Sequence, residues 1–199
     1  MNLIHKIKKT VVQYSKLIPL ILYPFAYLFF ILVYIIVMLV FPSSDSEEFS
    51  KLSMTIMYWT AIIYNIGMLC FCIYHSVSIV IKNVPASDAA WMNLAVKGLQ
   101  LPSYIFHFLM GFLGAAMSIW GIGFVLVAFT VIVLSILLTG ISSIGCGIRM
   151  KQEGILTFWK ALLMIIGSFI FCVDIIIAII YVVISKKHDM TNAERNFYN

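Results

Sequence analysis

The chain has 199 residues, of which 63% are hydrophobic and only 11% charged, and its formal net charge is +5. A soluble domain of this size is about half apolar and about a quarter charged, and a small globule has too little interior to hide the excess. The composition therefore argues against a soluble domain and predicts an all-α, polytopic transmembrane helix bundle in contact with the lipid bilayer. Because the basic residues flank apolar runs and form no patch of their own, a nucleic-acid partner is not expected.

Apolar runs long enough to cross a bilayer follow one another along the chain. A span needs about 20 apolar residues, so the sequence predicts about five spans. Their ranges are 17–41, 54–81, 101–118, 124–148 and 162–184, within a single membrane domain over 1–199. The first run is too long for a signal peptide and lacks a small-residue cleavage site. A polar tail, 186–199, ends the chain.

A short interfacial helix is expected over about 88–99, between the second and third spans. Ser87 is a candidate N-cap for it, and Pro102 fits the first turn of the span that follows. Asp88 and Lys97 are expected to point away from the apolar face of this helix, which consists of Trp91, Leu94, Ala95, Gly98 and Leu99. Such a helix lies along the membrane surface.

The distribution of basic residues predicts a cell-membrane protein with a cytoplasmic N-terminus, since Lys and Arg concentrate in cytoplasmic loops. This orientation puts most basic residues inside: Lys6, Lys8, Lys9, Lys16, Lys82, Lys97, Arg149, Lys151 and Lys160. Lys51 and the basic residues of the tail (Lys186, Lys187 and Arg195) then fall outside, so the tail fits this orientation badly. An alternative is that the last run, 155–185, bends near Gly167 as a re-entrant hairpin.

Small residues recur at helical spacing along several spans. Lipid does not push helices together, so packing in membranes relies on small residues and polar contacts. The residues expected to bring helices together are Gly111, Gly114, Ala115, Ser118, Gly140 and Gly167.

Asp174 is the main candidate for a functional group, because a charge near the bilayer centre usually faces a bundle interior or water. Asp174 lies about 15 Å from the end of its span, and Asn65 lies about 16 Å from the corresponding end of the second span. We therefore expect these two side chains to meet, with Tyr181 on the same face as Asp174. The interpretations left open are a structural hydrogen bond and a proton- or cation-handling role.

His75 and His107 are expected at equal depth on consecutive spans, each about 9 Å from an inner end. Two histidines are too few for a metal site, so packing or hydrogen bonding is the favoured interpretation, and no metal or cofactor is expected. Signatures of an enzyme are also missing from the sequence. It has no HExxH zinc pair, and Gly140-Ile141-Ser142-Ser143 has a serine where a GxSG protease motif needs glycine.

Two stretches resemble segments of a family of small, uncharacterised membrane proteins from Firmicutes. Lys97-Gly98-Leu99-Gln100-Leu101-Pro102-Ser103-Tyr104-Ile105 is similar to a K-x-x-Q-(I/L)-P-x-Y-I segment. Phe171-Cys172-Val173-Asp174, with Ala178-Ile179, is similar to an F-C-x-D-x-x-x-A-I segment. The resemblance covers roughly 93–185. It implies a multi-pass membrane protein and carries no activity.

Two functional hypotheses follow from these observations. The first is a non-enzymatic bundle that acts by association with a membrane-protein partner or as a homo-oligomer, because it has small-residue seams and minimal loops. The second is a small transporter or channel-like protein that uses Asp174, Asn65 and the histidines.

Overall fold

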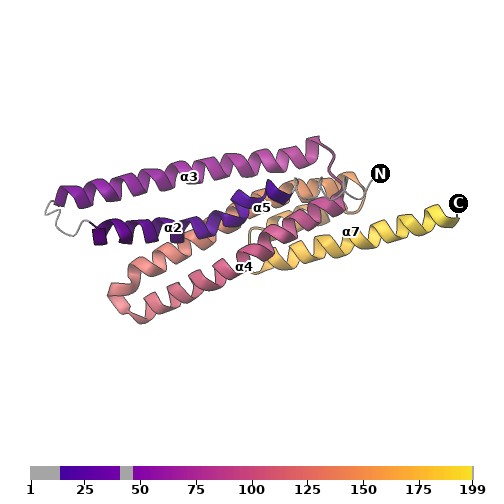
Figure 1. Cartoon of the computed structure of the whole chain (residues 1–199). Coiled ribbons are helices and arrows are strands. Elements are labelled where there is room, and N and C mark those ends of the chain that lie inside the picture. Colours follow the sequence, from indigo (N-terminus) through magenta and orange to yellow (C-terminus); the bar gives the residue numbers. More distant parts are fainter. Residues whose placement is uncertain (1–13, 41–46, 199) are drawn as a thin grey trace.

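The computed structural model describes residues 14–40 and 47–198, which form helices and no strand (Figure 1). The elements are α2 (Ile18–Val40), α3 (Glu47–Ile81), α4 (Ala86–Ala116), the 3-10 helix η1 (Ser118–Gly121), α5 (Ile122–Gln152), α6 (Phe158–Gly167) and α7 (Val173–Tyr198). In this part of the chain, 4 segments are long and apolar enough to cross a membrane, and they correspond to α2, α3, α4 and η1 with α5. The predicted all-α membrane bundle is confirmed. Lys6, Lys8, Lys9 and the loop at 41–46 lie outside the described residues.

The antiparallel pair α4 and α5 forms the centre of the bundle, with α3 packed against α5 and α7 packed against α4 (Figure 1). The turn between the two central helices is tight because Gly114 and Gly121 bring their backbones into contact. Ala115 and Ser118 were expected to pack helices together, but both are exposed, and Ser118 adopts a positive φ of 57° at the start of η1.

Small and hydroxyl-bearing residues line the buried face of α5. A Cβ on Gly140 would lie 2.6 Å from the Phe169 ring, and one on Gly145 would lie 2.6 Å from the Ser76 carbonyl oxygen of α3. The hydroxyls of Ser135 and Thr139 each donate to the carbonyl four residues earlier, at 2.7 and 3.0 Å. Because these hydroxyls are satisfied within the helix, α5 can be surrounded by other helices without leaving them unpaired.

The predicted interfacial helix and third span are a single helix, α4, which continues through Pro102. The expected break is wrong because packing on both sides of the proline outweighs its cost of about 3 kcal/mol in a helix interior. Gln100 donates to the Leu20 carbonyl of α2 at 2.6 Å, and Tyr104 donates to Gln100 at 2.8 Å. Trp91, Gly98 and Leu99 do share an exposed face, but Lys97, expected to point away from it, is buried inside the bundle.

The predicted fifth span is also not one helix. α6 ends at Gly167, turns occupy 168–172, and α7 begins at Val173, close to where the alternative interpretation placed a bend. α6 is about 15 Å long and the apolar part of α7, 173–185, about 20 Å, so each is shorter than the roughly 30 Å hydrocarbon core.

α6 and α7 form a hairpin that begins and ends at the same end of the bundle (Figure 1). At the start of α6, the Lys151 ammonium lies 5.2 Å from the Phe158 ring. On the returning helix, the Lys186 ammonium lies 4.9 Å from the ring of Trp91, which belongs to the first turns of α4. We call this end of the molecule, where α3, α5 and the apolar part of α7 end and α4 begins, the basic end.

Arg149 holds the basic end together. Its Nε donates to the Val84 carbonyl at 2.8 Å, and its Nη2 contacts Glu153 Oε1 at 2.7 Å. The same Glu153 oxygen accepts a hydrogen bond from the Ala86 backbone N–H at 3.0 Å. This arrangement fixes the loop between α3 and α4 to the end of α5.

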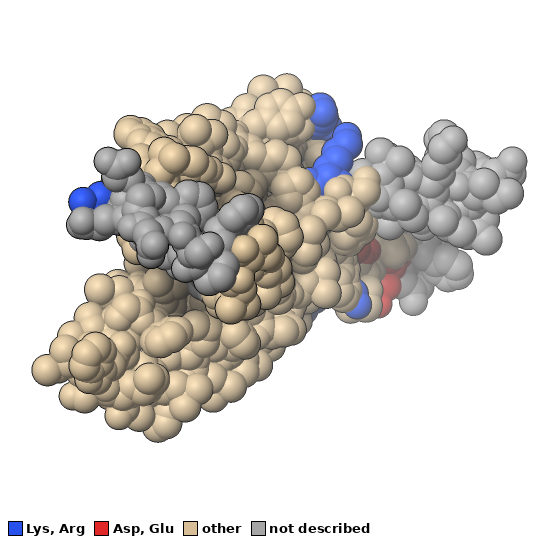
Figure 2. Space-filling model, turned by 60° about the vertical axis from the view of Figure 1, so that its left-hand side comes forward, with Lys and Arg blue, Asp and Glu red and all other residues tan. Residues whose placement is uncertain are grey.

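Apolar side chains cover most of the bundle surface between its ends. Large exposed residues on three different helices include Ile63, Phe112 and Phe129, which are 66 to 68% exposed. In Figure 2 the visible face is tan over most of its area, and the charged side chains gather at its edges. Such a surface suits contact with lipid.

The close approach of α4 to the turn at Gly121 makes Gly114 a test of the packing. A Cβ at Gly114 would lie 2.7 Å from the Gly121 carbonyl oxygen, so Gly114→Ala should destabilise the protein by about 1–3 kcal/mol through overpacking. Gly98→Ala is the matched control, since a Cβ there meets nothing within 4 Å and alanine favours a helix by about 1 kcal/mol. Thermal unfolding in detergent should rank Gly98→Ala at or above the wild type and Gly114→Ala below it. Equal melting temperatures for the two variants would contradict this packing.

Candidate functional site

A buried ion pair joins α4 to α7. Lys97 Nζ lies 3.5 Å from Asp174 Oδ2, and the two side chains are 0% and 1% exposed. Charge of this kind inside a membrane bundle is costly unless it is paired, and paired residues usually mark a functional site. Lys97 is about 16 Å from the start of α4, and Asp174 is about 18 Å from Lys186 on α7. The pair is therefore roughly half a hydrocarbon thickness away from the basic end.

The break between α6 and α7 provides partners for both charges. The last carbonyls of a helix lack intrahelical partners, and Lys97 Nζ lies 3.5 Å from the carbonyl oxygen of Ser168, the C-cap residue of α6. Asp174 lies in the first turn of α7. A cation at a helix C-terminus and an anion at a helix N-terminus are both stabilised by the helix dipole. A continuous helix over these residues would remove both effects.

Gln100 and Tyr104 extend the pair along the same face of α4. Tyr104 is buried, donates its hydroxyl hydrogen to Gln100, and packs edge-on against Phe171 with ring centroids 6.3 Å apart. Residues from two stretches far apart in the sequence, 97–105 and 171–179, thus lie side by side in space. Lys97, Gln100 and Tyr104 come from the first stretch, and Phe171 and Asp174 come from the second.

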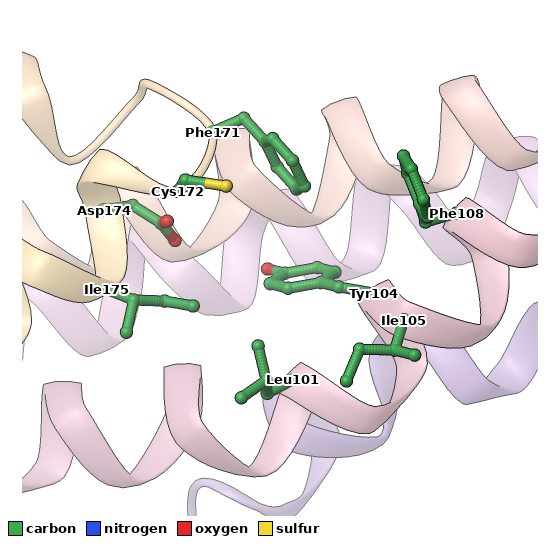
Figure 3. Close-up of a pocket in the computed structure, with 8 residues that line it drawn as sticks. All are labelled: Leu101, Tyr104, Ile105, Phe108, Phe171, Cys172, Asp174 and Ile175. Carbon is green, nitrogen blue, oxygen red and sulfur yellow. The ribbon is translucent and has the colours of Figure 1, made fainter.

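A cavity of about 280 Å³ lies between α4 and the start of α7 (Figure 3). The Asp174 carboxylate and the Tyr104 hydroxyl point toward each other at one end of this cavity. The remaining wall is apolar except for the Cys172 thiol, and its residues are Leu101, Ile105, Phe108, Phe171, Cys172 and Ile175.

A second group of buried polar side chains lies between the ion pair and the basic end. Ser143 of α5 donates to Asn93 Oδ1 of α4 at 2.8 Å, one turn before Lys97. In the described residues, the Asn93 amide nitrogen and the Tyr181 hydroxyl are buried without a hydrogen-bond partner. Cys146 is also buried. Buried polar atoms of this kind are commonly satisfied by internal water.

The expected contact between Asp174 and Asn65 is wrong, because Asn65 belongs to a different polar group. Its Oδ1 accepts from the Tyr27 hydroxyl at 2.9 Å and also from Tyr23, and its Nδ2 donates to the Ala61 carbonyl at 2.7 Å. α2 therefore binds α3 through its tyrosines. The depth estimate failed because it assumed that the fifth span was one straight helix that ended at the opposite end of the bundle.

The two histidines make their contacts within their own helices. His107 Nδ1 lies 2.8 Å from the Ser103 carbonyl oxygen, and the His75 ring stacks on Phe71 at 6.3 Å. Across residues 14–40 and 47–198, no three His, Cys, Asp or Glu side chains are grouped closely enough to hold a metal ion.

Lys97 is the member of this buried pair that the sequence interpretation missed. It was assigned to the outward side of an interfacial helix, although the spacing of Asn93, Lys97, Gln100 and Tyr104 at three and four residues places them on one helical face. That spacing was the available signal. It was overlooked because a lysine is usually exposed.

Direct pairing of Lys97 with Asp174 predicts that the stability losses caused by mutating the two residues are not additive. Lys97→Met or Asp174→Leu alone should each destabilise the protein by about 3–5 kcal/mol, because each leaves one buried charge unpaired. The double variant should recover most of that loss, since it leaves no buried charge at the site. Unfolding in detergent, analysed as a double-mutant cycle, measures the interaction. Additive losses would contradict direct pairing.

Comparison of the chain with protein-family models, with curated proteins and with solved structures gives no match.

Proposed function

We propose that this chain is a small transporter-like membrane protein that handles protons at the Lys97–Asp174 pair. The observation that carries the proposal is a buried ion pair placed across a break in a membrane helix. Buried ion pairs contribute little net stability compared with apolar packing, so stability alone does not account for the pair. Broken helices near mid-membrane are a recurring architecture of transporter binding sites.

The surroundings of the pair differ on its two sides, which favours transport over a purely structural role. α4 runs from the basic end through Asn93 to Lys97 and then along the cavity to Phe108. Of the three buried unsatisfied atoms in the described residues, those of Asn93 and Tyr181 lie on the side of the basic end, and that of His107 lies on the other side. The mostly apolar cavity lies on the other side. A group that separates a polar region from an apolar cavity is well placed to exchange a proton with one and contact a solute in the other.

The proposed orientation puts the basic end in the cytoplasm of a cell-membrane protein. Most described basic residues lie at that end or on helices that finish there, whereas Lys51 lies toward the opposite end at the start of α3. The hairpin of α6 and α7 would return the tail to the cytoplasmic side, so Lys186, Lys187 and Arg195 would obey the positive-inside rule. Five full spans would instead have placed these basic residues of the tail outside the cell, against the rule.

Association with a membrane partner, the other hypothesis from the sequence, remains a proposal without a feature that favours it. The apolar exposed faces of the described helices are what lipid contact alone requires. Recovery of a stable partner or oligomer in mild detergent would support the association hypothesis.

Cysteine accessibility tests the orientation. In a background with Cys70 and Cys172 replaced by serine, Ala193→Cys and Ser87→Cys should be labelled from the cytoplasmic side by a membrane-impermeant maleimide, and Trp120→Cys from the opposite side. Trp120 is 89% exposed at the far turn of the bundle. Labelling of Ala193→Cys from the same side as Trp120→Cys would contradict the re-entrant hairpin.

Proton flux tests the function. Purified protein in liposomes with an internal pH-sensitive dye should dissipate an imposed pH gradient faster than protein-free liposomes. Asp174→Asn should abolish the difference, because the amide cannot exchange a proton. Asp189→Asn, the same chemical change at an exposed position of α7, should retain it.

Folding of the Asp174→Asn variant is checked by size-exclusion chromatography. The double variant Lys97→Met/Asp174→Leu serves as a second inactive control without a buried charge. Wild-type flux equal to that of empty liposomes, under either polarity of the gradient and of the membrane potential, would rule out the proposal.

A further inference from the structure

Three buried groups, at the ion pair and on its basic-end side, have hydrogen-bonding capacity that the described residues do not use. The Lys97 ammonium has three hydrogens but contacts two acceptors there, the Ser168 carbonyl and Asp174 Oδ2. The Asn93 amide nitrogen and the Tyr181 hydroxyl have no hydrogen-bond partner in this part of the chain. Unsatisfied polar atoms are costly in a bundle interior, so these groups require a partner that the described side chains do not supply.

These groups follow one another from the ion pair toward the basic end. Asn93 precedes Lys97 by one turn on the same face of α4, and its amide oxygen accepts from Ser143 of α5. The Tyr181 hydroxyl lies beside Gly147, one turn beyond Ser143, since a Cβ on Gly147 would be 3.0 Å from the hydroxyl oxygen. Gly147 is in turn about 7.5 Å from the end of α5. The unsatisfied groups therefore mark a path from the middle of the bundle to the basic end.

The contacts between α4 and α7 bring Asn93 and Tyr181 to the same depth. The two helices run antiparallel here and touch at the ion pair and again where the Lys186 ammonium lies 4.9 Å from the Trp91 ring. Asn93 lies between these two contacts on α4, and Tyr181 lies between them on α7. Both side chains approach α5, at positions one turn apart. Water placed between them can therefore reach both.

On the other side of the ion pair, the nearest polar groups bond directly to protein. Gln100 lies between the pair and His107 on α4. Its amide nitrogen donates to the Leu20 carbonyl at 2.6 Å, and its oxygen accepts from Tyr104 at 2.8 Å. The third unsatisfied atom of the described residues, His107 Nε2, is about 15 Å from Lys97 along α4. Because the neighbouring cavity is lined almost wholly by apolar surface, a polar connection from the pair favours the basic end.

We propose that internal water bound by Asn93 and Tyr181 connects Lys97 to the basic end, and that the Tyr181 hydroxyl passes the proton on. The inference rests on the proposed function and assigns the route by which the ion pair exchanges its proton with the cytoplasm.

The transfer leaves the groups along the route unchanged. Lys97 gives one hydrogen to the water, the water gives one of its own to the Tyr181 oxygen, and Tyr181 releases its hydroxyl hydrogen toward solvent at the basic end. Lys97 is then neutral, the solvent has gained one proton, and the reverse steps recharge the lysine. Asn93 positions the water and takes no part in the transfer, because its amide keeps its hydrogens.

Proton flux in liposomes tests the route. Tyr181→Phe removes only the hydroxyl and should slow the flux about a hundredfold, the lower end of what a positioned proton-transfer group contributes. Tyr74→Phe, the same change at a 65% exposed position of α3, should retain the wild-type rate. Asn93→Leu should also slow the flux, and Asn93→Ser, which keeps a polar group and leaves space for more water, should recover much of that loss. A wild-type rate in Tyr181→Phe, or equal rates in the two Asn93 variants, would overturn the inference.

Stability tests the water site without reference to transport. If Asn93 and Tyr181 hold the same water, Asn93→Leu or Tyr181→Phe alone releases it, so the second change costs little more. Unfolding in detergent should then show a smaller loss in the double variant than the sum of the two single losses. In a dry site each change removes an unsatisfied polar atom, so both single variants should melt above the wild type. That outcome would overturn the inference.

The two tests separate this inference from the proposed function. Wild-type flux together with raised melting temperatures in both single variants would overturn the water route and leave the proposed function standing. Non-additive losses without any wild-type flux would rule out the proposed function and the transfer step, leaving a structural water site at Asn93 and Tyr181.

Discussion

The packing of Lys97 against Asp174 is the constraint on which the other features of this bundle depend. To reach each other, the two charges require a continuous α4 that carries Lys97 deep into the bundle. They also require a break that ends α6 and restarts the helix just before Asp174. The C-terminal end of α6 then faces the Lys97 ammonium, and the N-terminal end of α7 carries the Asp174 carboxylate, so each helix dipole stabilises the charge at its end. Within the break, Ser168 is buried and its carbonyl accepts from Lys97, which satisfies a backbone group that the irregular segment leaves without a helical partner.

α5 makes this arrangement possible because small residues interrupt its buried face where other elements approach it. Glycines at 140, 145 and 147 admit the hairpin tip, α3 and α6 at close range, where a methyl group would collide with each of them. Ser135 and Thr139, which precede these glycines, direct their hydroxyls to their own helix. Polar and small residues on α5 therefore serve close packing, while the charged chemistry is placed on the two helices that pack against it.

Local sequence patterns predicted the helices but did not predict how they combine. Hydropathy located the apolar runs because solvation by lipid is a property of each segment alone. It failed at Pro102, where hydrogen bonds to α2 keep α4 helical. It also failed at 168–172, where pairing of Asp174 with a lysine 77 residues earlier in the sequence favours a break. Asp174 was identified because a charge in an apolar run is conspicuous, whereas Lys97 was missed because a lysine in a predicted interfacial helix was expected to be exposed.

The long separation of the paired charges along the chain also affects how the protein is made. Lys97 is synthesised 77 residues before Asp174, an interval of about 4–15 s at roughly 5–20 residues per second. During that time the ammonium group has no carboxylate to meet, and an unpaired charge is excluded from hydrocarbon. We therefore expect the amino-terminal half of α4 to become stably buried only after the last hairpin has supplied the carboxylate of Asp174.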